Sequence, residues 1–536
     1  MSVFSKTVSE IISNHLYKKS IFLNGLVFDE PQVIAIMDSM KLNYFIKRIQ
    51  IENTEMTSFG WNKVFESIKI NSNIRYLIIV SCRIPAFSLS YFSRILSQLS
   101  LDRSLLNIEI RNCELDNVGS SSFSTALSTN APIQSLKLIH TNLDDEGCEK
   151  IILSIENNIY LETLDISNNY TRDISIAALS RALQINRTIK AIYISIDEGC
   201  DDTFALETIL KEKSSSLREL HFIGTSISKR LFSTLCNNLG YSQNLTTLSL
   251  QYLELESDSA MILSKALDSC VSLKILDLSN NFITVTGACY LAIALQHKSK
   301  LSILNLSGNI IGNQGFWAIS HALQNNKHLC ELNVNSNEID SMSFSALMEF
   351  FHQNQSVEHL HLGYNIFASI SIIDFFKAPL ICNRVKTLDL SGIDETGKIM
   401  NDVLMGLKFC SSISSVKLNK NILSVDCSDS LESLLADTQN LKSIELNNCI
   451  FGKGLIDSIS RGISLNHSLK ELKMAHCNIN EPDITVLLEG FQQNISITNL
   501  VLDDMYMKDF DNVLKRNITF SNSSLMMDLS YLIGEF

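Results

Sequence analysis

The 536-residue chain contains few residues that interrupt regular structure, and it has no long apolar run. Only 5 prolines and 20 glycines occur, and no Pro/Gly/Ser-rich stretch marks a linker between domains. The N-terminal segment lacks the apolar core of a signal peptide, and no run of about 18 apolar residues predicts a membrane span. We therefore expect one continuous architecture and no membrane partner.

Charge and cysteine usage exclude two further classes of protein. Lys and Arg total 44 against 57 Asp and Glu, which gives a net charge of -13. Nucleic-acid binding requires clustered basic residues, so no nucleic-acid partner is expected. The 13 cysteines are scattered, with no C-x-x-C pair. An odd, unpatterned set without a secretion signal indicates reduced thiols, which predicts a cytoplasmic location and no disulfide.

A 28-residue pattern fills nearly the whole chain. The segment LKILDLSNNFI begins at Leu273, and its next copy, LSILNLSGNII, begins 28 residues later at Leu301. This phase gives sixteen starts without a slip from Leu105 to Leu525, and earlier starts, including Ile46, precede a three-residue insertion. A fixed period of this length is the signature of a repeat protein.

The pattern within each unit predicts a strand followed by a helix. The L-x-L alternation is typical of a short strand with one buried face, whereas Leu291 and Leu295, four residues apart, lie on one face of a helix. Repetition of this pair gives parallel strands with right-handed crossovers. Helices need about 10 Å of lateral room and strands about 4.8 Å, so the stack must curve. The predicted fold class is α/β, a leucine-rich-repeat solenoid or horseshoe with strands on the concave face and helices on the convex face. We expect an N-terminal capping helix at residues 1–17 and a single solenoid of about 19 units at 18–536, ending in a strand begun at Leu525.

Two recurrent polar positions support this interpretation. Eight residues after a start, a buried residue is expected to satisfy the backbone of the turn. Asparagine or cysteine occupies this position at Asn169, Asn281, Asn309, Asn337, Asn365, Asn421, Cys82, Cys113, Cys449 and Cys477. Three residues before a start, asparagine recurs at the expected helix end, where it tolerates the left-handed conformation. Most N-x-S/T sequons, such as that of Asn186, fall there, so we interpret them as structural.

These motifs resemble the ribonuclease-inhibitor-type leucine-rich repeats. That repeat class also occurs in NOD-like receptors, in Ran GTPase-activating proteins and in effectors of intracellular bacteria such as Legionella. The resemblance covers roughly residues 18 to 530, and its motifs are specific for fold but not for function. It implies a protein-binding scaffold, and it is compatible with a secreted effector that acts in a host cytosol. The repeats leave no room for an appended catalytic or nucleotide-binding domain, so we expect no enzyme.

Three groups of residues could carry chemistry, and for each of them a structural role is the better interpretation. Residues 392–398 match the G-x-x-x-x-G-K phosphate loop, but Ile399 replaces the required Ser/Thr, and Asp394 would repel phosphates, so no cofactor is expected. Two histidines on one strand, with neighbouring carboxylates, resemble a zinc shell. These weak metal candidates are His359 and His361, expected beside Glu331 and Asp389, and we favour an ordinary polar strand surface without metal.

No cysteine is a good candidate nucleophile. Cys449 and Cys477 occupy the turn position, and Cys148 and Cys289 are expected at helix starts facing the core.

The exposed strand positions predict a binding surface instead. Between the units that begin at Leu161 and Val385 these positions hold acids and histidines but no Lys or Arg. The predicted partner-binding residues are Asp165, Glu219, His221, Asp277, Glu331, His359, His361 and Asp389. We expect them to be exposed and to dock a protein with a basic surface, in a salt-dependent manner and more weakly near pH 6. The alternative is a GTPase-activating protein of the Ran type, for which Arg48 is the one early basic candidate.

Overall fold

The computed structural model describes residues 19–99, 105–197, 199–211, 216–297, 300–367, 372, 375–376 and 383–533. The expected capping helix at residues 1–17 lies outside the described residues and stays a prediction. The chain divides into two units, one of Met1–Leu255 with Lys265–Leu276 and one of Glu256–Ser264 with Asp277–Phe536.

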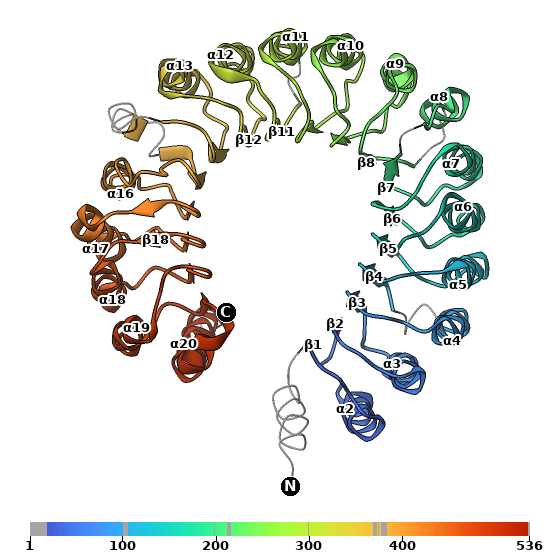
Figure 1. Cartoon of the computed structure of the whole chain (residues 1–536), viewed down its shortest axis with the longest axis horizontal. Coiled ribbons are helices and arrows are strands. Elements are labelled where there is room, and N and C mark those ends of the chain that lie inside the picture. The colour runs from blue at the N-terminus through green and yellow to red at the C-terminus, as the bar shows by residue number, and fades with distance from the viewer. Residues whose placement is uncertain are drawn as a thin grey trace. The chain divides into compact units, whose positions relative to one another are not determined.

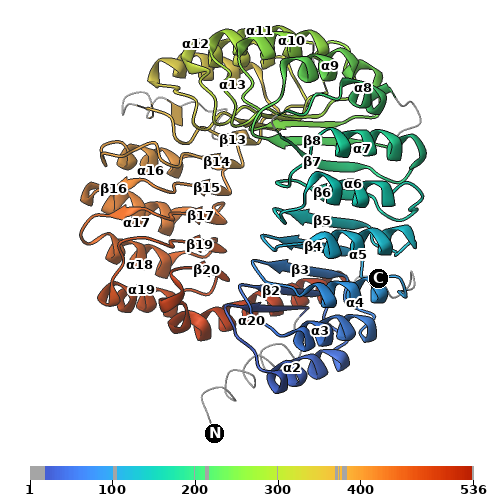
Figure 2. The ribbon, with the colours of Figure 1, turned by 45° about the vertical axis from the view of Figure 1, so that its right-hand side comes forward.

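The first unit alternates parallel strands and helices, with all its helices on one side of its strands (Figures 1 and 2). Its strands are β1 (Ser20–Asn24), β2 (Arg48–Glu52), β3 (Tyr76–Val80), β4 (Asn107–Arg111), β5 (Ser135–Ile139), β6 (Thr163–Ile166), β7 (Ala191–Ile196), β8 (Glu219–Gly224) and β9 (Thr247–Gln251). Its helices are α2 (Glu30–Leu42), α3 (Ser58–Ile70), α4 (Ala86–Leu96), α5 (Asn117–Ser128), α6 (Asp145–Ser154), α7 (Asp173–Ile185), α8 (Thr203–Lys211) and α9 (Lys229–Asn238). Helix α10 (Ser257–Leu267) and strand β10 (Ile275–Asp277) contain residues of both units.

The second unit continues the same alternation. Its strands are β11 (Ile303–Asn305), β12 (Glu331–Asn333), β13 (His359–His361), β14 (Thr387–Asp389), β15 (Ser415–Lys417), β17 (Ser443–Glu445), β19 (Glu471–Lys473) and β20 (Asn499–Val501). Its helices are α11 (Val285–Leu295), α12 (Gly312–Leu323), α13 (Phe344–Gln353), α16 (Met400–Lys408), α17 (Ser428–Asp437), α18 (Leu455–Leu465), α19 (Glu481–Gln493) and α20 (Asp504–Ile533). The short strands β16 (Ile422–Leu423) and β18 (Ile450–Phe451) form a separate pair.

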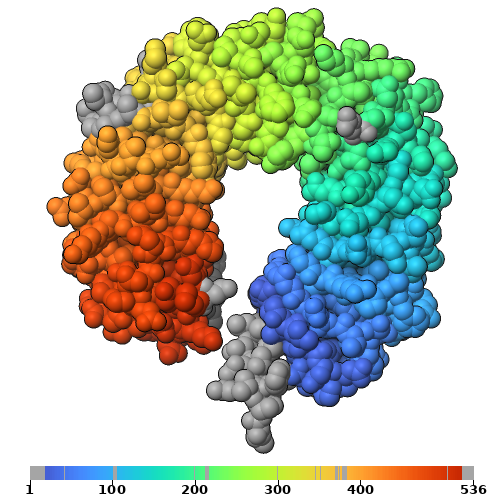
Figure 3. All heavy atoms as spheres, viewed as in Figure 1, coloured from blue at the N-terminus to red at the C-terminus, as the bar shows by residue number. Residues whose placement is uncertain are grey.

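The 28-residue period determines which residues pair between neighbouring strands. In unit 1, Ile49 lies opposite Leu77, and in unit 2, Leu332 lies opposite Leu360, which is 28 residues away. These leucines and isoleucines are buried between the strand and helix layers, and in the space-filling view of each unit successive repeats abut (Figure 3). The α/β repeat solenoid predicted from the sequence is therefore confirmed. The side of each strand layer that faces away from the helices, called here the open strand face, carries the polar positions.

The ladder of turn residues is as predicted. The side-chain nitrogen of Asn169 donates to the carbonyl oxygens of Leu138 (2.7 Å) and Ile166 (2.9 Å), so one amide joins two successive turns. Where cysteine replaces asparagine, the thiol takes over one of these bonds, as Cys449 does with the carbonyl of Leu418 (3.1 Å). The substitution is tolerated because a thiol is a weak donor of similar reach.

The second asparagine position works differently from our expectation in most repeats. Asn130 is left-handed as predicted, with φ of 58°. Asn186, Asn354 and Asn494 instead end their helices with extended backbone and φ of -65°, -82° and -79°, so the left-handed conformation was the wrong reason for asparagine at these three positions. Their amides instead donate to carbonyls of the preceding repeat, as Asn494 does to Ile463 and Asn466. Asn186 is 3% exposed, which supports the structural interpretation of its sequon.

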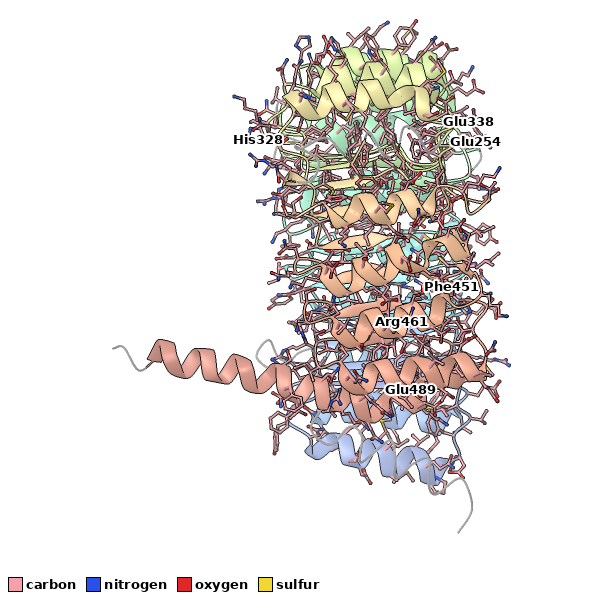
Figure 4. The ribbon with its side chains drawn as sticks, turned by 90° about the vertical axis from the view of Figure 1, so that its left-hand side faces the viewer. Glu254, His328, Glu338, Phe451, Arg461 and Glu489 are labelled. Carbon is pink, nitrogen blue, oxygen red and sulfur yellow. The ribbon has the colours of Figure 1, made fainter. Side chains whose placement is uncertain are left out.

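The expected strand at Leu525 is also wrong, because α20 continues through it to Ile533. Figure 4 shows this helix running past the edge of unit 2 on which His328 lies. Arg516, inside α20, connects this helix to α19 by donating to the carbonyls of Gln492 (2.7 Å) and Phe491 (3.2 Å) at the end of α19. The last repeat start has Asp528 where a buried aliphatic residue is needed, and the segment contains neither Gly nor Pro, so nothing in it stops a helix. Among the described residues, no helix is both long and apolar enough to cross a membrane.

Candidate functional site

The open strand face of unit 2 brings together three of the predicted partner-binding residues. The ring of His361 on β13 lies between two carboxylates, with Nε2 3.5 Å from Oε1 of Glu331 and Nδ1 3.6 Å from Oδ2 of Asp389. The strand register was predicted correctly, since Glu331 pairs with His359 and Asp389 with His361. The side chain of Glu331, however, reaches diagonally to His361.

The charges of this cluster stabilise one another. Burial alone would raise the pKa of Asp389, but hydrogen bonds from His361, Ser391 and Asn335 lower it to about 2. The pKa of Glu331 is lowered mainly by its bond with His361. Burial of the His361 ring would lower its pKa, and the two carboxylates outweigh this and raise it. The cluster is therefore anionic, with a histidine that gains a proton more readily than in water.

Two of the predicted surface acids are buried, not exposed. Asp165 and Asp389 are 5% and 6% exposed. Oδ1 of Asp389 accepts the backbone N–H (3.0 Å) and hydroxyl (2.7 Å) of Ser391, two residues later, and Asp165 holds Ser167 in the same way. This is an Asx turn, which ends the strand. It explains why aspartate occurs at this position: its side chain, like that of asparagine, accepts the backbone N–H two residues later. The sequence signal was the recurrent Asp/Asn-x-Ser/Asn at the strand ends, which our prediction did not use.

The metal interpretation of the two histidines gains no support from the geometry. A metal requires ligand atoms that converge on one point, whereas Glu331 and Asp389 approach opposite nitrogens of the His361 ring. Among the described residues, no group of three His, Cys, Asp or Glu side chains is placed to hold a metal ion.

The predicted residues of unit 1 form a different arrangement. The rings of His221 and Tyr193 stack with centroids 3.9 Å apart, and the Tyr193 hydroxyl donates to Glu219 (3.3 Å). Burial lowers the pKa of His221 to about 4, so this histidine is neutral near pH 6, contrary to our expectation of a switch there. Asp277, in unit 2, accepts the backbone N–H of Ser279 (2.9 Å).

Basic residues lie next to the acidic positions. Lys417 lies opposite Asp389 in register, and the amino group of Lys473 lies 3.0 Å from Glu445 and 3.3 Å from Glu471. In unit 1, Arg48 is exposed on β2 between Ser20 and Tyr76, neither of which is a carboxylate that could orient it.

The segment that matches a phosphate loop is closed by its own carboxylate. Asp394 is 3% exposed and accepts backbone N–H groups from Thr396 (3.0 Å), Gly397 (2.8 Å), Ile399 (2.8 Å) and Met400 (3.0 Å). Burial would raise the pKa of Asp394, but these bonds lower it. The carboxylate occupies the place where a phosphate would accept the same hydrogen bonds, so this loop caps α16 and is not a phosphate cradle.

The cysteines fit a structural role, with one correction. The twelve cysteines among the described residues form no disulfide with one another. Cys148 is buried as expected, but Cys289 is exposed, because its helix turns that position outward. Burial raises the pKa of the Cys449 thiol to about 12, which makes it a poor nucleophile.

Comparisons with known proteins agree with the repeat. A family model described as Leucine Rich repeat matches residues 269–292. The Homo sapiens protein "NACHT, LRR and PYD domains-containing protein 5" is 24% identical over 249 residues, covering 45% of this chain and 20% of that protein. The Homo sapiens "Centrosomal protein of 78 kDa" is 21% identical over 198 residues, covering 33% of this chain and 29% of that protein. The chain thus spans less than a third of the length of these relatives.

Solved structures are more distant. The yeast structure "Crystal structure of Rad7 and Elc1 complex in yeast" is similar with a TM-score of 0.44 and 14% identity, covering 83% of this chain and 93% of that one. "Leiomodin-1 Actin-Binding Site 2 (ABS2)" gives a TM-score of 0.28 at 14% identity over 30% of this chain and 95% of that one. The observed repeats and the family match at residues 269–292 support a leucine-rich-repeat scaffold, which is consistent with a protein-binding role.

Proposed function

We propose that this chain is a non-enzymatic, protein-binding repeat scaffold of the ribonuclease-inhibitor type, and that unit 2 recognises a basic protein surface through its open strand face. The observation that carries the proposal is the anionic cluster around His361. Two carboxylates with lowered pKa values flank one imidazole there. An Arg or Lys of a partner would find the half-exposed carboxylate of Glu331 as a charged acceptor, and the buried carboxylate of Asp389 beside it adds to the negative field.

His361 competes with a cationic partner for the carboxylates of Glu331 and Asp389. When His361 is protonated, its ring satisfies both carboxylates, and a cationic partner then has less to gain. We therefore expect association to weaken as pH falls through the raised pKa of His361. A cytosolic location, in the cell of origin or in a host cell that receives the protein as an effector, completes the proposal and rests on the free thiols and the resemblance.

The test is binding of a partner identified by affinity purification and then produced pure. In the variant Asp277→Asn/Glu331→Gln/Asp389→Asn, the turns survive because asparagine already holds the equivalent turn at Asn305 and Asn333. The control Asp429→Asn/Glu432→Gln/Asp437→Asn removes three charges from helix α17. We expect the strand variant to bind more weakly and the helix variant to bind as wild type. Unchanged binding by the strand variant would refute the proposed site.

A further inference from the structure

The repeat pattern breaks in unit 1 at the carboxyl ends of β7 and β8. At the ladder position, three successive repeats hold Asp197, Thr225 and Leu253, whereas Asn169 precedes them. A repeat protein that departs from its own rule at one edge commonly does so for a binding site.

The break changes the backbone. In regular repeats the residue before the ladder position is left-handed, as Asn168 is with φ of 56°. Strands β7 and β8 instead run for six residues each, through Ile196 and Gly224, and neither residue is among the described positive-φ positions. Glycine is required at 224 because a Cβ there would lie 2.3 Å from the carbonyl oxygen of Ile196. The turns after these strands are therefore displaced from the regular position.

The displaced turns leave an open hollow of about 740 Å³. It is lined by residues of five successive repeats, among them Asn142, Tyr170, Asp197, Gln251 and Tyr252. In Figure 4, Glu254, which follows this lining, marks the edge at which the turns lie. The rings of Tyr170 and Tyr252 are 59% and 53% exposed. Among the described residues that line the hollow there is no Lys or Arg, and Asp197 is the one acid.

Asp197 lacks the hydrogen bonds that its position normally makes. Asn169 donates to two carbonyls, but a carboxylate has no hydrogen to donate. Its Oδ2 atom is buried without a hydrogen-bond partner among the described residues. Burial raises the pKa of Asp197, and Arg172 only partly opposes this. A cationic group that reached this oxygen would satisfy it more fully than Arg172 does, whereas an anion would be repelled by the carboxylate.

We propose that this hollow binds an arginine side chain presented by an extended peptide segment of a partner protein. The planar guanidinium stacks on exposed tyrosine rings and donates to Asp197 and to the side-chain oxygens of Asn142 and Gln251. The volume exceeds one side chain, which leaves room for the adjoining residues of the peptide. All the lining residues belong to unit 1, so the proposal is independent of the site around His361.

The test uses three defined probes on the full chain. Ligand-observed NMR titrations compare acetyl-Gly-Gly-Arg-Gly-Gly-amide, the same peptide with citrulline for arginine, and maltotriose as an uncharged sugar that also suits tyrosines and amides. We expect the arginine peptide to bind about tenfold more tightly than the citrulline peptide, the factor for one lost hydrogen bond to a charged group.

Asp197→Asn separates binding from folding, because it installs the regular ladder residue. We expect this variant to unfold at the same or a higher temperature and to lose about tenfold in affinity for the arginine peptide. Glu146→Gln, an exposed acid on α6, is the charge-matched control and should bind as wild type. Equal binding of the arginine and citrulline peptides, unchanged affinity of Asp197→Asn, or preference for maltotriose would each overturn the proposal.

Discussion

Nδ1 of His361 lies 3.6 Å from Oδ2 of Asp389 on the neighbouring strand, and this pair links the stability of unit 2 to its proposed binding. The same carboxylate that ends strand β14 through Ser391 also attracts the imidazole. Asp389, which ends its strand, is thus also one of the proposed binding residues.

The first prediction concerns the pH dependence of this pair. The pKa of His361 is raised in the folded chain, so its contribution to stability is fully present below about pH 6.5 and is lost as pH rises through the folded value. His361→Gln should therefore destabilise the protein more near pH 5.5 than near pH 8. Urea unfolding at the two pH values measures this, and an equal loss at both would show that the pair does not titrate as described.

His221 should show the opposite sign. Burial lowers its pKa to about 4, so the unfolded chain takes up a proton before the folded chain does. Above about pH 6.5 the ring is neutral in both states, so its burial carries no penalty from a lost proton. As pH falls from there towards 4, only the unfolded chain is protonated at this residue, and the folded protein loses stability. His221→Gln should reduce this acid sensitivity, as measured by unfolding between pH 7 and pH 5. Steeper acid sensitivity in the variant would contradict the assignment.

Asp394 should contribute to the stability of the fold and not to nucleotide binding. Asp394→Ala leaves several N–H groups at the start of α16 without an acceptor and should cost about 1–3 kcal/mol. Urea unfolding checks the cost, with the exposed neighbour in Glu395→Ala as the control. If the two variants were equally stable, the carboxylate would not be the cap.

Thiol chemistry tests the cysteine environments. In the denatured, unreduced chain we expect about all 13 thiols to react, since the twelve described cysteines are free. In the native chain, Cys289 is exposed and should react fast with a disulfide reagent, whereas burial keeps Cys236 and Cys449 slow. Cys289→Ser should remove one fast thiol. A denatured count near one or three would establish disulfides instead.

The repeat made most of the fold predictable from sequence. Each 28-residue phase places an aliphatic pair such as Leu332 and Val334 in the core, and that burial is the same physical demand in every unit. The error in secondary structure occurred at Leu525, where the pattern is degenerate. Asp528 stands there at an aliphatic position, and the helix α20 continues through the expected strand.

The sequence predicted which site residues pair between neighbouring strands, but it did not predict which of their side chains are exposed. Strand pairing placed Asp389 beside His361, yet alternation alone cannot tell whether an outward aspartate points to solvent or folds back onto its own turn. The hollow near Asp197 was not predicted because it lies where the chain departs from the repeat consensus. The interruption of the asparagine ladder after Asn169 was the available signal.

We propose above all that the anionic open strand face of unit 2 binds a basic protein surface. The most direct test of this proposal is the equilibrium affinity of a purified partner for wild type and for the Asp277→Asn/Glu331→Gln/Asp389→Asn variant, at about 10 mM and about 150 mM salt. We predict that wild type binds more tightly at low salt, and that the variant loses both the extra affinity and most of its salt dependence. The same affinity and the same salt dependence in both proteins would contradict the claim.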